Sequence, residues 1–225
     1  MCYNRIMKRI ICLLILTCLL VLPLAGCAQD TPDTSSVDAY LATFTAGSFG
    51  IQNPSDPIVE FTFEGYGTVR VELYPSVAPI SVNNFLRYVG DKFYDGTIMH
   101  RVIAGFMIQG GGYYLDGNTI MTKSTYAAIT GEFSSNGVTN DVLHTAGVLS
   151  MARANNPNSA TSQWFICSAT ASHLDGDYAA FGKVIDQESM AVVLAISQVE
   201  TIYVNASFAN FPYPPVTVTS VKRLK

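Results

Sequence analysis

The 225-residue sequence predicts a mainly β domain, in which a closed antiparallel barrel is capped by two helices. Three observations lead to this prediction. Apolar residues recur at every second position in IVEFTF and TVRVELY, which is the period of a strand with one buried face. Two longer segments carry apolar residues at the helical spacing of three and four. Short apolar runs bounded by Gly, Asn, Pro and Ser fill most of the remainder.

The individual elements follow from these patterns in chain order. Residues 58–63 and 68–74 form a β-hairpin, because glycines stand between the two alternating runs. Residues 78–90 form a short helix that is capped by Ser81 and ends at Gly90. A second helix over 186–199 is capped by Asp186 and presents Met190, Val193 and Leu194 on one face. Further strands are expected around 98–103, 106–109, 147–151, 163–167, 180–184 and 216–223.

The N-terminus has the pattern of a secretory signal. Three basic residues among the first nine precede the apolar run Ile10–Leu22, which is short for a membrane span. The LAGC at 24–27 resembles the bacterial lipoprotein box, in which the cysteine, here Cys27, is lipidated. An ordinary signal peptide with a chance cysteine is the alternative, and Met1 and Met7 both stay open as the start. We therefore expect a lipoprotein signal peptide over 1–26, a lipid-anchored tether over 27–56 and a folded domain over 57–225.

Composition narrows the partners and the chemistry. Residues 1–26 hold three of the 13 Lys and Arg residues and none of the 17 Asp and Glu residues, so the remaining chain has a formal charge of −7. No basic patch is left to follow a phosphate backbone, and nucleic acid is not expected as a partner. Only Cys167 lies in the expected domain, so no disulfide can form within it. Without a CxxC or His/Cys spacing, no metal site is expected.

Two stretches place polar side chains among residues that otherwise suit a core. In MHRVIAGFMIQGG, residues 99–111, an arginine and a glutamine stand among apolar neighbours, where an unpaired polar group is costly. Alternation along the strands and a bend at Ala104-Gly105 put Arg101, Met107 and Gln109 on one outer surface, with Phe106 at the corner. The same alternation points His100, Val102 and Ile108 inward.

The second stretch is LSMARANNPNSATSQWFIC, residues 149–167. Gln163 and Phe165 share a face of its second strand, so this stretch supplies another amide and another aromatic ring. The small residues Ala152 and Ala154 would let another backbone come close.

At this point a family resemblance is visible. MHRVIAGFMIQGG, GVLSMARANNPNSATSQWFI and HLDGDYAAFGKV resemble the signature stretches of the cyclophilins, which are peptidyl-prolyl cis-trans isomerases. The hairpin and the first helix occur in the expected order, and the similarity runs from about Pro57 to Val221. Together with the LAGC box, this is similar to a bacterial lipoprotein form of the family. The resemblance implies a closed antiparallel eight-stranded β-barrel capped by two α-helices.

The resemblance also implies which residues form the site. The family's catalytic arginine falls on Arg101, and Gln109 and Gln163 would bind the substrate backbone. Phe106, Met107, Phe165 and Leu174 would form the apolar seat for a proline ring. The substrate-binding positions are His100, Phe106, Met107, Gln109, Ala152, Arg153, Ala154, Gln163, Phe165, His173, Leu174 and Tyr178. Taken from the residues alone, His100 and His144 are expected to be structural rather than acid–base catalysts, and Cys167 to be inert core.

Three positions depart from the commonest family pattern. His173 stands where many members have tryptophan or phenylalanine, and Tyr178 stands where many have histidine. Both lie at the pocket rim, so they bear on cyclosporin affinity more than on isomerase activity. Arg153 replaces an asparagine, which matters little if that residue contributes mainly its backbone groups.

The implied reaction is the rotation of an X–Pro amide, whose barrier is about 18–20 kcal/mol. Arg101 would donate to the prolyl nitrogen, whose lone pair is freed as the amide twists. Such a site needs no nucleophile, no metal and no cofactor, but it must bind the twisted amide better than the planar one.

The implied partners are proline-containing unfolded or partly folded proteins outside the cytoplasm, where X–Pro isomerisation can limit folding. The protein would contact the membrane through its lipid anchor and act as a monomer. Two rival functions stay open. One is a module that binds proline-containing peptides without turnover, and the other is a barrel that holds a small ligand.

Overall fold

The computed structural model describes residues 41–42 and 49–225. The expected signal peptide, Cys27 and most of the expected tether lie outside the described residues. Within the described part, no helix has the length and apolar character needed to cross a membrane.

The described strands form two antiparallel sheets, one of eleven strands and one of two. The large sheet has the order β4-β5-β9-β8-β10-β2-β1-β13-β3-β6-β7. Its strands are β1 (Ile58–Phe63), β2 (Gly67–Leu73), β3 (Thr97–Ile98), β4 (Arg101–Ile103), β5 (Met107–Gly110), β6 (Tyr113–Asp116), β7 (Thr119–Thr122), β8 (Val148–Met151), β9 (Trp164–Cys167), β10 (Ala180–Val184) and β13 (Thr217–Arg223). The small sheet pairs β11 (Thr201–Ile202) with β12 (Phe211–Pro212).

The strand expected over 98–103 is interrupted, which bears on the expected barrel. β3 and β4 are separated only by Met99 and His100, and β13 pairs with β3 while β5 pairs with β4. The amide of Met99 donates to the carbonyl of Val216 at 2.9 Å, and the amide of His100 donates to that of Gln109 at 3.0 Å. The large sheet therefore has eleven strands rather than the expected eight, and no pairing of the described strands joins β4 to β7 at its two ends. Closure of the barrel stays a prediction.

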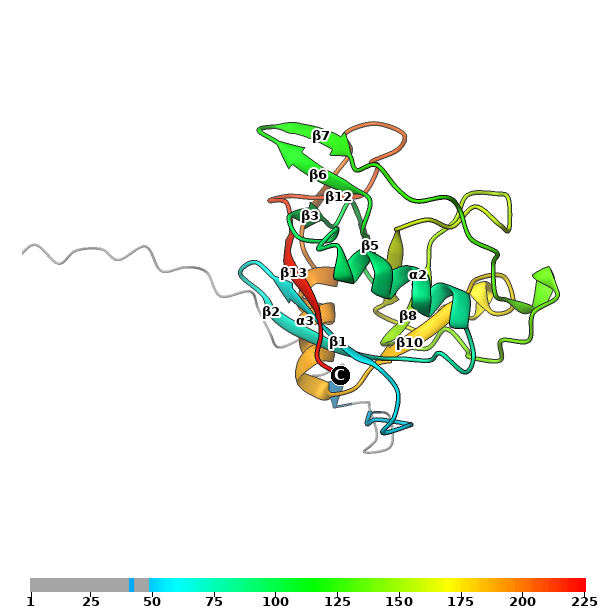
Figure 1. Cartoon of the computed structure of the whole chain (residues 1–225). Helices are drawn as coiled ribbons and strands as arrows, with labels where there is room; N and C mark the ends of the chain where they lie inside the picture. Colours follow the sequence, from blue (N-terminus) through cyan, green and yellow to red (C-terminus); the bar gives the residue numbers. More distant parts are fainter. Residues whose placement is uncertain (1–40, 43–48) are drawn as a thin grey trace, which may run out of the picture. The chain divides into compact units, whose positions relative to one another are not determined.

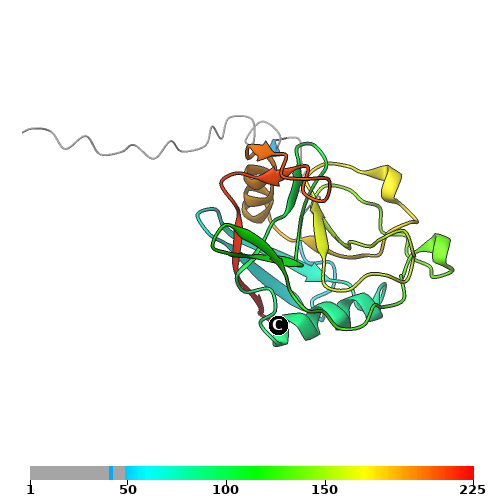
Figure 2. The ribbon, with the colours of Figure 1, turned by 90° about the horizontal axis from the view of Figure 1, so that it is seen from above.

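Two α-helices, α2 (Pro79–Gly90) and α3 (Gln187–Ser197), lie on opposite sides of the strands (Figures 1 and 2). α3 begins as expected, because the Asp186 carboxylate accepts a hydrogen bond from the Ser189 amide at 2.7 Å. The expected cap of α2 is wrong. Ala78 occupies the capping position without a side-chain hydrogen bond, and Ser81 lies inside the first turn.

A distant carboxylate takes the place of the expected cap of α2. Glu132, which is 2 % exposed, accepts hydrogen bonds from the Ile80 amide at 2.9 Å and from the Ser81 amide and hydroxyl at 2.7 Å. The first amides of a helix lack intrahelical partners, and a negative charge there also complements the helix dipole. Glu132 thus caps α2 and fixes the chain near residue 132 to the domain.

The main core lies between the sheet and the helices. Phe61, Phe181 and Trp164 are completely buried, and the ring of Phe61 lies 4.8 Å from that of Trp164. Phe85 of α2 packs on Phe61 at 5.8 Å. Large aromatic side chains therefore fill the core on the inner face of the sheet, as the inward alternation of the strands predicts.

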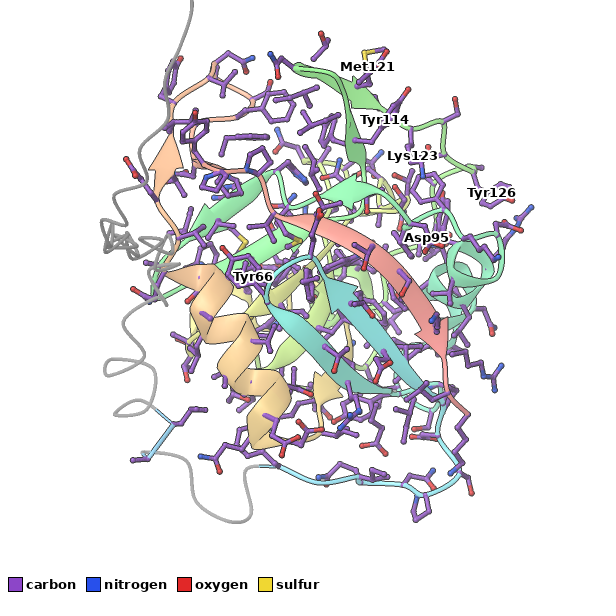
Figure 3. The ribbon with its side chains drawn as sticks, turned by 90° about the vertical axis from the view of Figure 1, so that its left-hand side faces the viewer. Tyr66, Asp95, Tyr114, Met121, Lys123 and Tyr126 are labelled. Carbon is purple, nitrogen blue, oxygen red and sulfur yellow. The ribbon has the colours of Figure 1, made fainter. Side chains whose placement is uncertain are left out.

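The long connection between β7 and β8 is held by side chains rather than by strands. The Lys123 ammonium donates to the carbonyls of Phe93 and Asp95, and the Tyr126 hydroxyl donates to the Asp91 carboxylate at 2.5 Å (Figure 3). Backbone hydrogen bonds also hold it, among them those from the Ile129 amide to the Ala160 carbonyl at 2.9 Å and from the Ser135 amide to the Gly176 carbonyl at 2.8 Å. The anchors at Lys123 and Tyr126 fix the connection beside the C-terminal end of α2.

The described part of the expected tether is also bonded to the domain. The carboxylate of Glu72 on β2 is fully buried and accepts the amides of Gln52 and Asn53, each at 2.7 Å. The Gly50 amide donates to the carbonyl of Ile185 at 2.9 Å.

His100 points into the interior, as the alternation predicts. Its ring is 4 % exposed and lies 4.7 Å from the ring of Tyr113 and 6.3 Å from that of Phe208. Burial and, second, the charge of Arg101 lower the pKa of His100 to about 4, while the Gln163 side chain acts in the opposite direction. His100 is therefore neutral at physiological pH.

We predict that Glu132→Ala lowers the free energy of unfolding by about 3 kcal/mol, because two buried amides and a hydroxyl lose their acceptor. Urea unfolding followed by circular dichroism measures this. Glu64→Ala, on an exposed turn, is the matched control and should change stability by less than about 0.5 kcal/mol. Equal effects of the two substitutions would refute the capping role.

A second prediction concerns how the free energy of unfolding depends on pH through His100. The unfolded chain protonates His100 near pH 6.5, whereas the folded chain resists protonation to about pH 4. The stability linked to His100 is therefore complete above pH 6.5 and is lost as the pH falls from 6.5 toward 4, by about 3 kcal/mol. Urea unfolding between pH 7.5 and 4 should show a smaller decline in His100→Phe than in the wild type. In the control His173→Ala, at an exposed position, the free energy of unfolding should fall with pH as it does in the wild type. Parallel pH curves for the wild type, His100→Phe and His173→Ala would show that His100 is not the group responsible.

Candidate active site

Three neighbouring strands bring the expected polar and aromatic residues to one face. In the register of β4 with β5, Arg101 lies opposite Gln109, and in that of β5 with β9, Gln109 lies opposite Phe165. The hairpin between β4 and β5 turns at Gly105, whose φ of +68° is the left-handed conformation that glycine adopts readily. The bend expected at Ala104-Gly105 is confirmed.

A pocket of about 120 Å³ opens on this face. It is lined by Arg101, Phe106, Met107, Gln109, Ala152, Arg153, Phe165, Leu174 and Tyr178. All nine were identified from the sequence. The other expected site residues do not line it: His100, Ala154, Gln163 and His173.

The floor of the pocket is a small apolar cluster apart from the main core. Its buried members are Met107, Phe165, Cys167, Ala171 and Leu174, and Phe106 and Tyr178 pack against them. Burial and, second, the charge of Asp175 raise the pKa of the Cys167 thiol to about 12. Cys167 is therefore a neutral part of the floor and not a nucleophile, as expected.

The polar side of the pocket is a short chain of side chains. Arg101 Nη1 donates to Gln109 Oε1 at 3.4 Å, and Gln109 Nε2 donates to Gln163 Oε1 at 3.1 Å. Gln163 thus lies behind Gln109 rather than on the pocket wall, and its hydrogen bond orients the Gln109 side chain.

Among the described residues, Arg101 has no acidic partner. The ion pairs of the described residues join Arg70 to Glu60 and to Asp186, and His144 to Asp175. Burial lowers the pKa of Arg101 from its usual value, although a guanidinium stays charged at neutral pH. Most of its donors are therefore free to meet a ligand in the pocket.

The glycines at 110–112 make room for this arrangement. A Cβ atom at Gly112 would lie 2.7 Å from Gln163 Nε2, and one at Gly111 would lie 2.7 Å from Trp164 Nε1. Gly111 also has a φ of +86°. Close packing accounts for these glycines, so they give no support to a phosphate-binding loop.

Behind the floor lies a hydrogen-bonded chain of Asp175, His144 and Ser150. His144 Nδ1 is 3.0 Å from Asp175 Oδ1, and Nε2 is 3.1 Å from Ser150 Oγ. The order resembles a hydrolase triad, but Ser150 is completely buried and cannot reach a substrate. The His144 ring lies nearly parallel to that of Phe165, with 6.1 Å between centroids. The chain supports Phe165, and the structural role expected for His144 fits this contact. No sequence signal had identified Asp175 or Ser150.

The rim carries the three departures from the family pattern. The ring of His173 lies 5.1 Å from that of Phe106, and Tyr178 lies edge-on to Phe165 at 5.9 Å. The guanidinium of Arg153 lies 4.6 Å from the ring of Tyr178 and lines the pocket. The side chain of Arg153 thus makes contacts of its own at the rim, whatever its backbone groups contribute. Ala154 contributes its carbonyl, which accepts from Arg153 Nη1 at 2.9 Å.

Among the described residues, no group of three or more His, Cys, Asp and Glu side chains is placed to hold a metal ion.

Comparison with known proteins gives a consistent result. The family model of the cyclophilin type peptidyl-prolyl cis-trans isomerases matches residues 58–223. A peptidyl-prolyl cis-trans isomerase of Acinetobacter baylyi is 47 % identical over 69 % of this chain and 80 % of its own. Peptidyl-prolyl cis-trans isomerase A of Dickeya dadantii is 42 % identical over 71 % of this chain and 80 % of its own.

The solved structures agree with the sequence relatives. A cyclophilin type isomerase of Cryptosporidium parvum, crystallised in the presence of the dipeptide Ala-Pro, has a TM-score of 0.58 and 26 % identity. The similarity covers 75 % of this chain and 99 % of that one. The matched region includes every residue that lines the pocket. The chain belongs to the family of cyclophilin-type peptidyl-prolyl cis-trans isomerases.

Proposed function

We propose that the protein accelerates the isomerisation of X–Pro bonds in proteins that fold outside the cytoplasm. One observation carries the proposal for the reaction: Arg101, which has no acidic partner in the described part of the chain, lines a pocket with an apolar floor, next to two linked amides. This arrangement suits a substrate that combines an apolar ring with a polar backbone. The family membership supports the same reaction.

Each part of the pocket has a task in this mechanism. Met107, Phe165 and Leu174 bind the proline ring, because burial of apolar surface is favourable there. Gln109 holds a neighbouring carbonyl, and Gln163 orients Gln109 through their hydrogen bond, so that one part of the chain stays fixed while the other rotates. The bound amide then turns about its C–N bond without leaving the pocket.

Arg101 lowers the barrier because it binds the twisted amide better than the planar one. In the planar amide the nitrogen lone pair is delocalised, and it accepts a hydrogen bond only as resonance is lost. A donor placed at that nitrogen therefore acts mainly in the transition state. A ten-thousandfold acceleration requires about 5.4 kcal/mol. No proton is transferred, so no group in the site needs to titrate near neutral pH.

We also propose that eight strand segments close into a barrel. The supporting observation is that residues 97–103, which hold β3 and β4, are bonded to β13 through one half and to β5 through the other. If β3 and β4 are counted as one bent strand, this strand pairs with β5 at one end of the order β5-β9-β8-β10-β2-β1-β13 and with β13 at the other. The eight segments then form a closed ring. The β6–β7 hairpin then extends from the side of the barrel.

The proposed location rests on the sequence. LAGC at residues 24–27 supports lipidation of Cys27, which would anchor the protein stably because more than one acyl chain inserts. An isomerase of this kind needs no ATP, so it could work on the outer side of the cytoplasmic membrane. The clients would be proline-containing proteins that emerge unfolded, and the protein would act on them as a monomer.

The two rival functions differ from this proposal at defined points. A packed interior, with Phe61, Phe181 and Trp164 completely buried, favours the isomerase over a barrel that holds a small ligand. A peptide-binding module without turnover would use the same pocket, so only a rate measurement separates it from the enzyme.

We predict that Arg101→Ala reduces kcat/KM for a short X–Pro peptide by about 10²- to 10³-fold, the range for loss of one preorganised transition-state donor. Exchange NMR of the cis and trans peptide signals measures the rate without a protease. Arg70→Ala, on β2 and paired with Glu60, is the control and should retain the wild-type rate. A folded wild type that binds the peptide but does not accelerate exchange would establish the binding module instead.

A further prediction tests the anchor. When the full chain is expressed in a bacterium with a labelled fatty acid, the wild type should carry the label and fractionate with membranes. Cys27→Ser should lose both properties, since the sulfur is the acylation site, whereas Cys167→Ser should keep them. Label that persists in Cys27→Ser, or is absent from the wild type, would refute the lipoprotein proposal.

A further inference from the structure

The pocket contains a second guanidinium that the isomerisation mechanism does not use. Arg153 follows β8 and lines the pocket together with Arg101, Met107 and Phe165. Its neighbours Ala152 and Ala154 are small, so Arg153 is the one large side chain of this edge.

The side chain of Arg153 is held in place at the rim. Nε donates to the carbonyl of Asp177 at 3.0 Å, and Nη1 donates to those of Ala154 at 2.9 Å and Asn155 at 3.3 Å. The guanidinium also lies 4.6 Å from the ring centroid of Tyr178 and 5.2 Å from that of Phe133. Contacts on several sides reduce the entropy that the side chain must lose when it binds a ligand.

Some donors of Arg153 remain unused. A guanidinium has five N–H donors, and the hydrogen bonds within the described residues come from Nε and Nη1. Both donors of Nη2 are therefore available. A carboxylate is the ligand that matches a guanidinium in charge and geometry.

The charge of the pocket is one-sided. Two guanidiniums line it and no carboxylate does, and neither Arg101 nor Arg153 takes part in an ion pair of the described residues. The whole sequence is acidic, with a formal net charge of −4. A concave site of one sign attracts ligands of the opposite sign, whatever the net charge elsewhere.

We propose that Arg153 makes this isomerase prefer X–Pro segments in which a residue immediately flanking the proline is acidic. The inference rests on the proposed isomerase function and names the substrate class of that same pocket. Arg153 lines the pocket that holds the ring, so a side chain next to the proline is close enough to pair with it. Arg101 supplies the catalytic hydrogen bond, and Arg153 supplies the preference.

The test compares peptides that differ only in charge. Glu and Gln have nearly the same shape, so kcat/KM for Ala-Glu-Pro-Phe divided by that for Ala-Gln-Pro-Phe isolates the effect of the carboxylate. A second pair places Glu or Gln after the proline. In the wild type at low ionic strength, we expect at least one pair to give a ratio of about two to five, as a partly exposed ion pair supports. In 0.5 M NaCl the ratio should approach one, because salt screens such pairs.

The variants assign the effect to one residue. Arg153→Gln should lower the ratio to about one, and Arg153→Lys should keep it above one because the charge remains. Arg70→Gln, outside the pocket, should keep the wild-type ratio. A wild-type ratio of one for both pairs, or an unchanged ratio in Arg153→Gln, would overturn the inference while leaving the isomerase intact. Failure of the wild type to turn over any of the peptides would instead refute the proposed function.

Discussion

The register of three short strands is the constraint on which the site depends. Arg101, Gln109 and Phe165 lie opposite one another only because β4 pairs with β5, and β5 with β9, in one alignment. A slip of one residue would turn each of these side chains into the interior. The alignment is held from the other face, where Val102, Ile108 and Ile166 are completely or almost completely buried. Packing of the main core therefore sets the geometry of the pocket outside it.

Where the chain has no regular structure, hydrogen bonds from polar side chains fix the position of the backbone. Between β7 and β8 the backbone is fixed by Lys123, by Glu132 and by Asn140, whose amide donates to the carbonyls of Glu132 and Ala180, both at 2.9 Å. Each of these polar groups is satisfied, so its burial is not a defect. The connection then leads through His144 to β8, and the Asp175–His144–Ser150 chain supports Phe165. A long irregular segment thereby reaches the pocket floor through a few hydrogen bonds.

Local patterns in the sequence predicted most of these elements, and the exceptions have physical reasons. The β1–β2 hairpin, α3 and its Asp186 cap follow from residues close in the chain. The cap of α2 could not be predicted, because Glu132 lies about fifty residues away in sequence. The β6–β7 hairpin was missed because β7 is mostly exposed and lacks a buried alternating face. For the site, the family resemblance identified every lining residue, whereas His100 lies in the interior, where its strand position had placed it. The contacts of the Arg153 side chain with Tyr178 and Phe133 could not be predicted, because sequence position alone does not show which way it extends.

The glycine at position 112 has a consequence for how this protein can change over generations. A Cβ atom there would lie 2.7 Å from Nε2, 2.8 Å from Cγ and 3.0 Å from Cδ of Gln163, so this side chain would have to move. At Gly182, in contrast, a methyl group would lie 2.6 Å from the backbone oxygen of Glu72 within the β2–β10 pairing. A side chain at 182 therefore conflicts with the fold itself, because the backbone of a paired strand cannot move aside. A side chain at 112 conflicts instead with Gln163, whose hydrogen bond to Gln109 belongs to the polar side of the pocket. Position 182 is thus constrained by strand pairing, and position 112 by the geometry of the site.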